Sequence, residues 1–83
     1  MERITEKMVQ NNVNYLNKLT GHENAKYSEI GAYTLDYAYG GVALDQYINE
    51  HGGVSRILDR CTKKELYNGI HAIITGINIA KNL

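Results

Sequence analysis

The sequence predicts an α+β fold, and three observations support this prediction. Apolar residues recur at helical spacing near both ends of the chain, whereas apolar and small or polar residues alternate in between. The chain has 83 residues, which fits one domain spanning 1–83, because domains usually contain roughly 50 to 250 residues. We therefore expect long N- and C-terminal helices, with a short tyrosine-rich strand or hairpin and a short helix between them.

The first element is a helix over residues 2–19. Its apolar positions return every three to five residues, as in an amphipathic helix, and Gly21 stands where a C-terminal cap is expected. These positions are Ile4, Met8, Val9, Val13, Leu16 and Leu19. Four asparagines lie on the same helix: Asn11, Asn12, Asn14 and Asn17. Each lowers helix propensity by about a few tenths of a kcal/mol, so the helix needs tertiary packing.

The middle of the chain changes period. Over residues 30–39 tyrosine and leucine alternate with small or polar residues, which predicts one strand or two short ones, and Gly40-Gly41 ends this pattern. Residues 42–51 then show helical spacing up to Gly52-Gly53, which predicts the short middle helix, with His51 capping its C-terminus. Residues 54–58 fit a turn or a strand.

The C-terminal helix begins at a capping box, Thr62-Lys63-Lys64-Glu65, in which a hydroxyl and a carboxylate accept from reciprocal backbone donors. Its apolar stripe is Leu66, Ile70, Ile73, Ile74 and Ile77. A neighbouring row of small residues consists of Gly69, Ala72, Gly76 and Ala80. Such a row lets another backbone approach closely, and a domain this small is marginal without a disulfide or metal. We therefore expect a homo-oligomer.

Composition excludes several classes of protein. Nine Lys plus Arg balance nine Asp plus Glu, so no charge excess favours nucleic acid or an anionic membrane. No apolar run approaches the roughly 20 residues of a membrane-spanning helix, and the N-terminus does not start a signal peptide. The single cysteine, Cys61, fits a reducing compartment. We expect a cytoplasmic protein without a membrane partner.

Residues capable of metal binding or catalysis are few. The histidines His22, His51 and His71 and the cysteine Cys61 lack the close paired spacings of zinc motifs. Cys61 precedes the N-terminus of a helix, where the dipole can lower a thiol pKa, yet a small apolar cysteine is more often buried and inert. No base and orienting group accompany it. We expect no metal, no cofactor and no enzymatic activity.

Three features instead favour a binding site for a small anion. Exposed amides at the two Gly-Gly turns attract anions, nearby cations offer charge-assisted hydrogen bonds, and alternating tyrosines offer a stacking platform. The candidate ligand-binding residues are Tyr37, Tyr39, Gly40, Gly41, Gly52, Gly53, Arg56, Arg60, Lys63 and Lys64. Each feature also has a plainer interpretation, since two glycines form ordinary turns, surface cations are usually solvated, and a tyrosine stripe often faces a core.

Three sequence blocks, in order, carry a family resemblance. They are residues 31–41 (GAYTLDYAYGG), 48–54 (INEHGGV) and 63–67 (KKELY), followed by Gly76-Ile77 near the end of the last helix. Over residues 19–77 this pattern resembles a family of small uncharacterised tailed-bacteriophage proteins. Lys64 stands where that pattern has arginine, and His51 replaces a frequent glycine. The resemblance implies a phage origin and an infected host cell, and it carries no assigned activity.

Two functions of different classes follow as expectations. The first is a non-enzymatic binding protein, a homo-oligomer that sequesters a small anionic, nucleotide-like ligand as a sponge against a host defence signal. The second is a protein-protein inhibitor or accessory factor that acts on a host protein through its tyrosine-rich face. The paired Gly-Gly turns with cations favour the first, and the neutral charge without a complete phosphate motif favours the second.

Overall fold

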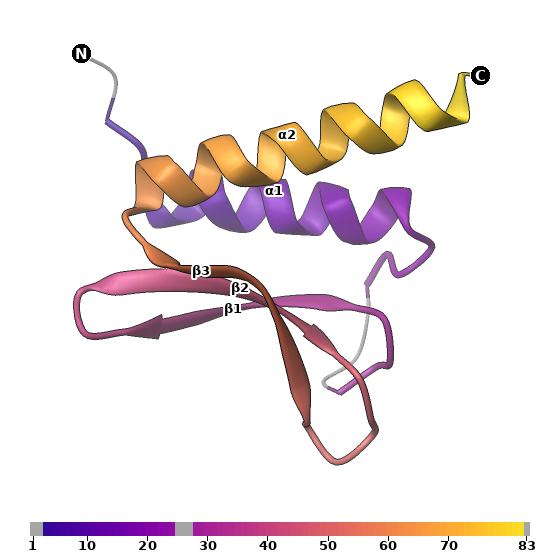
Figure 1. Ribbon diagram of the computed structural model, residues 1–83, viewed down its shortest axis with the longest axis horizontal. Coiled ribbons are helices and arrows are strands. Elements are labelled where there is room, and N and C mark those ends of the chain that lie inside the picture. The colour runs from indigo at the N-terminus through magenta and orange to yellow at the C-terminus, as the bar shows by residue number, and fades with distance from the viewer. Residues whose placement is uncertain (1–2, 25–27, 83) are drawn as a thin grey trace.

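Two helices cover one face of a three-stranded antiparallel sheet in the computed structural model, which describes residues 3–24 and 28–82 (Figure 1). In chain order the elements are α1 (Glu6–Leu19), β1 (Tyr33–Ala38), β2 (Gly41–Tyr47), β3 (Val54–Cys61) and α2 (Lys63–Lys81). The strands lie in the order β1-β2-β3. The α+β class and the long terminal helices are therefore confirmed.

Helix α1 follows the apolar spacing of its sequence. Thr5 is its N-cap and accepts a hydrogen bond from the backbone N–H of Met8, while Thr20 is its C-cap and Gly21 follows. Val9, Val13 and Leu16 form its buried stripe. The helix is also tied to the sheet through Asn17, whose side-chain Oδ1 accepts from the Tyr33 N–H at 2.7 Å and whose Nδ2 donates to the Tyr33 carbonyl at 3.1 Å. Asn17 thus takes the place of a neighbouring strand at this point of the β1 edge.

The predicted middle helix is wrong, because residues 41–47 form the central strand β2. Val42, Ala43, Leu44 and Asp45 are all buried, so this strand is covered on both faces. A strand covered on both faces loses the simple two-residue alternation, and its continuous apolar run is easily confused with a buried helix. The undecided segment 54–58 belongs to β3, which pairs with β2 through an irregular register near Leu44.

Helix α2 begins as predicted. Thr62 is the N-cap, and the Thr62 hydroxyl accepts from the Glu65 N–H at 3.1 Å while the Glu65 carboxylate accepts from the Thr62 N–H at 3.2 Å. These hydrogen bonds, the one to the Thr62 backbone first, lower the pKa of Glu65. The capping box therefore fixes the point where β3 ends and the helix starts.

Replacing Thr62 by alanine should destabilise the protein by about 1 kcal/mol, because it removes the acceptor for an otherwise unpaired helix N–H group. Chemical denaturation measures this loss. Thr75→Ala is the matched control, since Thr75 is an exposed threonine in the interior of the same helix and has no capping role. Equal stability of Thr62→Ala and the native protein would contradict the assignment of this cap.

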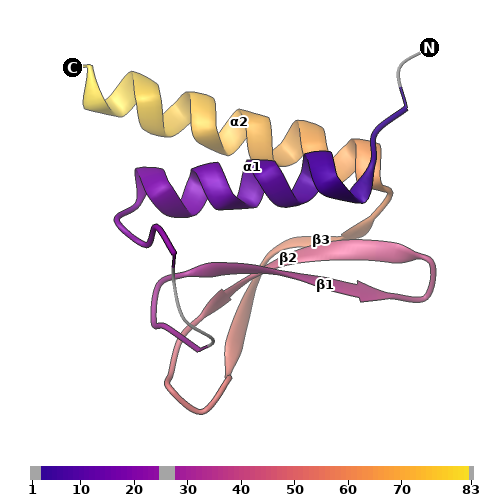
Figure 2. The ribbon, with the colours of Figure 1, turned by 180° about the vertical axis from the view of Figure 1, so that it is seen from behind.

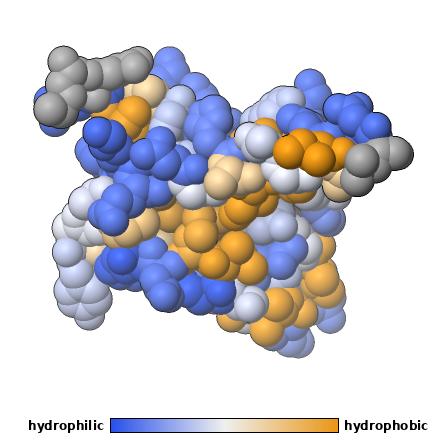
Figure 3. Space-filling view, turned by 45° about the horizontal axis from the view of Figure 1, so that its top comes forward, coloured by the Kyte–Doolittle hydropathy of each residue, from blue (hydrophilic) through white to orange (hydrophobic). Residues whose placement is uncertain are grey.

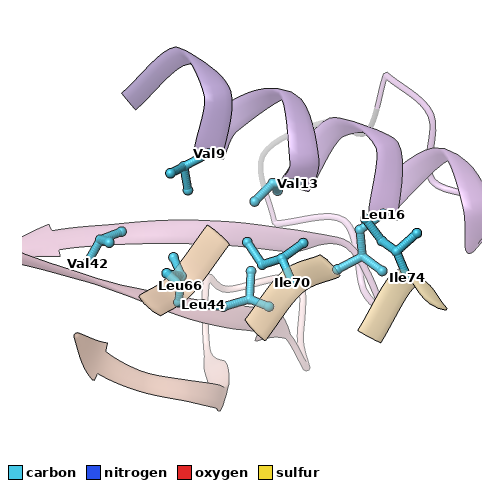
Figure 4. Close-up of a cluster of buried hydrophobic side chains, with 8 residues drawn as sticks. All are labelled: Val9, Val13, Leu16, Val42, Leu44, Leu66, Ile70 and Ile74. Atoms are coloured by element: carbon cyan, nitrogen blue, oxygen red, sulfur yellow. The ribbon is translucent and has the colours of Figure 1, made fainter. Parts of the chain in front are cut away.

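The hydrophobic core lies between the helices and the sheet (Figure 4). Eight side chains from α1, β2 and α2 point toward one another there: Val9, Val13, Leu16, Val42, Leu44, Leu66, Ile70 and Ile74. Seven of them are at most 1% exposed. Three come from the predicted stripe of α2, so the helical periodicity correctly identified the buried side of that helix.

Candidate functional site

The β1-β2 hairpin ends in a two-residue turn formed by Tyr39 and Gly40, because Ala38 and Gly41 are the last paired residues. Both turn residues have positive φ, +52° for Tyr39 and +74° for Gly40. This combination matches the type I′ turn, which favours Asn-Gly because asparagine and glycine tolerate left-handed backbone. Tyrosine at the first position costs about 1 kcal/mol or more. Its side chain is nevertheless 99% exposed.

The sheet face opposite the helices, here called the open face, carries four charged side chains: Asp36, Asp45, Arg56 and Arg60. Leu35 and Leu44 pack toward the core, so the residues that follow them, Asp36 and Asp45, point to the open face, because strand side chains alternate. Figure 2 shows both helices above the sheet, so the open face is turned downward in this view.

This Arg-Asp cluster is closely paired. Arg56 donates through Nε to the Asp45 carboxylate at 2.6 Å and through a terminal nitrogen to Asp36 at 3.2 Å. Arg60 donates to the Asp36 carboxylate at 2.7 Å and to the carbonyls of Asp36 and Ala38. The Asp45 side chain is only 5% exposed, because Arg56 covers it.

The cluster therefore changes the expectation for a phosphate site. Two arginines and two aspartates sum to zero charge, and Arg60 already donates three hydrogen bonds within the protein. A phosphate here would compete with carboxylates held at 2.6 and 2.7 Å and would meet no net positive field. The two arginines predicted to bind an anion instead join the three strands on the open face.

Four other predicted residues do come together. Tyr37, Gly40, Gly41 and Lys63 line a hollow of about 350 Å³ beside the hairpin, here called the hairpin hollow. Glu6 of α1 lines it too. Burial, with a smaller contribution from the Glu6 carboxylate, raises the pKa of the Tyr37 phenol. The hollow thus offers one ring, one cation and one anion.

The second Gly-Gly pair, Gly52-Gly53, does not line the hairpin hollow but lies in the turn that joins β2 to β3. Asn49 organises this turn: its side-chain oxygen accepts from the N–H of His51 at 2.9 Å and from the N–H of Gly53 at 3.0 Å. The Gly53 amide predicted to bind an anion is therefore occupied. His51 caps no helix, contrary to the sequence prediction, because it belongs to this turn.

The remaining predicted residues occupy separate positions. Lys64 is exposed in the first turn of α2, and Tyr39 projects from the hairpin tip with the Arg60 guanidinium carbon 5.9 Å from its ring centroid.

In the predicted row of small residues on α2, Gly69 packs inside the protein: an added Cβ would lie 2.9 Å from a Leu58 methyl carbon. Ala72, Gly76 and Ala80 are exposed.

The sequence did not reveal the aspartates that pair with the two arginines, nor the asparagines that bond to backbone groups of the β2-β3 turn and of β1. Asp36 lies 24 residues from Arg60, and Asp45 lies 11 residues from Arg56, so the pairs follow only from the strand register. Asn49 had a local signal, because an asparagine a few residues before a glycine pair often bonds to turn amides. Asn17 had none, since its partner, Tyr33, lies across the α1-β1 connection.

Cys61 sits at the end of β3 with its sulfur 3.8 Å from the Val42 carbonyl. Burial, followed by the carboxylates of Glu65 and Asp59, raises the pKa of its thiol. Across the described residues, no three His, Cys, Asp or Glu side chains gather closely enough to hold a metal ion.

We expect Cys61 to react with iodoacetamide more slowly than an unfolded cysteine at pH 8, because the thiolate is the nucleophile and a raised pKa leaves less of it. Mass spectrometry gives the alkylation rate with and without urea. A native rate equal to or above the rate in urea would instead identify an activated thiol.

No protein-family model, no curated protein and no solved structure matches this chain. The resemblance to small tailed-phage proteins therefore stays a prediction. Neither helix in the described part of the chain is long and apolar enough to cross a membrane.

Proposed function

We propose that this chain is a small protein-interaction module that presents Tyr39 at the tip of the β1-β2 hairpin to a partner protein. The observation that carries the proposal is the combination of left-handed backbone and full exposure at Tyr39. The ring is not buried, and its exposed contact with Arg60 recovers less free energy than the left-handed backbone costs. Strained residues of this kind concentrate at functional sites. Binding a partner is a role in which an exposed tyrosine at this position is useful.

The surroundings of Tyr39 support a protein partner. Arg60 lies below its ring, and Tyr37 nearby is 45% exposed. Tyrosine and arginine are the residues most enriched, with tryptophan, among those that dominate binding energy at protein interfaces. The resemblance to phage proteins makes a host protein the expected partner, and the role is binding rather than catalysis.

The exposed apolar side chains also support a protein partner. Eight large apolar or aromatic side chains are at least 38% exposed: Tyr15, Ile30, Tyr37, Tyr39, Ile48, Val54, Ile57 and Ile79. Figure 3 shows that apolar residues gather in the middle of one face and again near its right edge, between polar areas. Gathered apolar surface on a small domain is typical of interaction surfaces.

Photo-crosslinking tests the proposal. A benzophenone amino acid is placed at position 39 or, as the control, at exposed Asn68 on α2, and both proteins are irradiated in an extract of the cells in which the protein occurs. We expect a discrete adduct from position 39 that is absent from position 68. Equal adduct patterns from both positions, or none from position 39, would overturn the proposal.

A nucleotide-like ligand is the second candidate, because the hairpin hollow gathers Tyr37, Gly40, Gly41 and Lys63. Its volume of about 350 Å³ lies at the lower end of the range for small-molecule sites. Glu6 opposes an anion there, and we therefore rank this function second. Calorimetric titration with cyclic and linear nucleotides tests it. Heat that disappears in Lys63→Ala would favour this ligand and the sponge function.

Assembly of several copies remains part of both functions. Replacing Gly76 by leucine should dissociate the homo-oligomer that we propose, because a Cβ at this position meets no atom of its own protomer within 4 Å, and a leucine on this exposed row of small residues would hold a second helix away. The same change should stabilise the isolated protomer by about 0.5 to 1 kcal/mol through helix propensity. Light scattering measures the mass. A native protein that is monomeric at micromolar concentration would contradict this part of the account.

A further inference from the structure

A second hollow, larger than the hairpin hollow, lies between α1, the start of β1 and the end of β2. Its volume is about 610 Å³, well within the range of small-molecule sites. Among the described residues four side-chain amides line it, those of Gln10, Asn14, Asn17 and Asn24, and we call it the amide hollow. It lies at the start of β1, whereas Tyr39 lies beyond the end of β1, about 20 Å away along the strand.

The amides of the hollow are partly held in place. Asn17 is fixed by its two hydrogen bonds to the Tyr33 backbone. Gln10 donates to the Asn14 Oδ1 at 3.0 Å, and this bond leaves the Gln10 carbonyl as an acceptor and the Asn14 NH₂ as a donor. An acceptor and a donor side by side on one turn of a helix match adjacent hydroxyl groups, each of which both donates and accepts.

Aromatic and charged groups narrow the class of ligand. Tyr15, at 46% exposure, lines the hollow next to Asn14 and offers an apolar ring face with a polar tip. Lys18 and Glu23 also line it and balance each other in charge, and His22 is bonded to Glu29 at 2.8 Å. The charges of the described lining residues therefore balance, and they favour neither an anion nor a cation.

The composition of α1 also calls for an explanation. The side chain of Asn14 is exposed, so packing does not require an asparagine there. Asparagine has a lower helix propensity than alanine, by about a few tenths of a kcal/mol. Asn14 contributes neither to the core nor to a cap, and within the described part of the chain its side chain is bonded to Gln10 alone. Hydrogen bonding to a ligand gives this residue a role.

We propose that the amide hollow binds a neutral, hydroxyl-rich ligand, a mono- or disaccharide. The amides of Gln10 and Asn14 exchange hydrogen bonds with adjacent hydroxyls, and the Tyr15 ring packs on the C–H face of the sugar. The site is independent of Tyr39, so its test and the test of the protein-interaction function can fail separately.

Titration of ¹⁵N-labelled protein with the methyl glycosides of glucose, galactose, mannose and N-acetylglucosamine, to on the order of 10 mM, tests the proposal by NMR. We expect one glycoside to shift the amides of Asn14, Tyr15 and Thr34 but not those of Tyr39 and Gly40. Asn14→Ala should weaken binding at least about tenfold, a loss of roughly 1.4 kcal/mol.

Asn11→Ala is the matched control, because Asn11 is an exposed asparagine of the same helix that does not line the hollow. It should leave glycoside affinity unchanged. Both substitutions favour the helix, so neither should prevent folding. The proposal is overturned if no glycoside shifts these amides, if Asn11→Ala weakens binding as much as Asn14→Ala, or if nucleotides shift them more strongly than any glycoside.

Discussion

Replacing Leu44 by alanine is expected to destabilise the protein by about 2 to 5 kcal/mol, the largest stability effect that we predict for a single substitution. Leu44 is fully buried in the central strand and lies between β1 and β3, opposite Leu35 and Leu58. Truncation to alanine leaves a cavity at the centre of the eight-residue core cluster. The neighbouring side chains are closely packed and can move only partly into this cavity.

Urea denaturation followed by circular dichroism measures this effect. The control is Ile48→Ala, because Ile48 is an apolar residue with 56% exposure just beyond the same strand, and its truncation should change stability by no more than about 0.5 kcal/mol. A loss below about 1 kcal/mol for Leu44→Ala would mean that β2 is not the centre of the fold.

Replacing Tyr39 by asparagine is expected to stabilise the free protein while removing its binding activity. Asparagine tolerates left-handed backbone, and Asn-Gly is the preferred pair for this turn. Relief of the backbone strain is worth about 1 kcal/mol or more, whereas loss of the exposed contact between Arg60 and the Tyr39 ring costs about 0.5 kcal/mol. The backbone effect is larger, so the net gain should be about 0.5 to 1 kcal/mol.

Thermal and urea denaturation of Tyr39→Asn measure the gain in stability. Tyr37→Asn provides a control of opposite sign: Tyr37 lies within β1, where asparagine is disfavoured, so this substitution should destabilise the protein. A loss of stability in Tyr39→Asn would show that the tyrosine stabilises the hairpin and would remove the main argument for a binding role.

The helices could be predicted from the sequence because their signals are local. The capping box at Thr62 and Glu65 involves residues three apart, and the stripe of Leu66, Ile70 and Ile74 repeats within one element. Strand β2 could not be predicted in the same way. Asp45 is covered by Arg56 of β3 and Ala43 is fully buried as well, so this strand lacks the alternation that marks a half-exposed strand.

The candidate site was predicted in composition but not in arrangement. The sequence pattern placed Tyr39 in the strand and the turn at Gly40-Gly41, whereas the pairing of Ala38 with Gly41 puts Tyr39 and Gly40 in the turn and gives Tyr39 its left-handed φ. Arg56 and Arg60 looked like free cations because their aspartate partners are 11 to 24 residues away. The sequence therefore favoured an anion site, whereas the pairing of these charges favours a protein contact through Tyr39.

The affinity of the partner that cross-links to position 39 tests the central claim most directly. Calorimetry would compare the native protein with Tyr39→Asn and with Asn68→Ala, which changes an exposed residue of α2. We predict that Tyr39→Asn weakens binding at least about tenfold, or roughly 1.4 kcal/mol, although it is the more stable protein, and that Asn68→Ala binds as the native chain does. Equal affinities for the native protein and Tyr39→Asn would contradict the account.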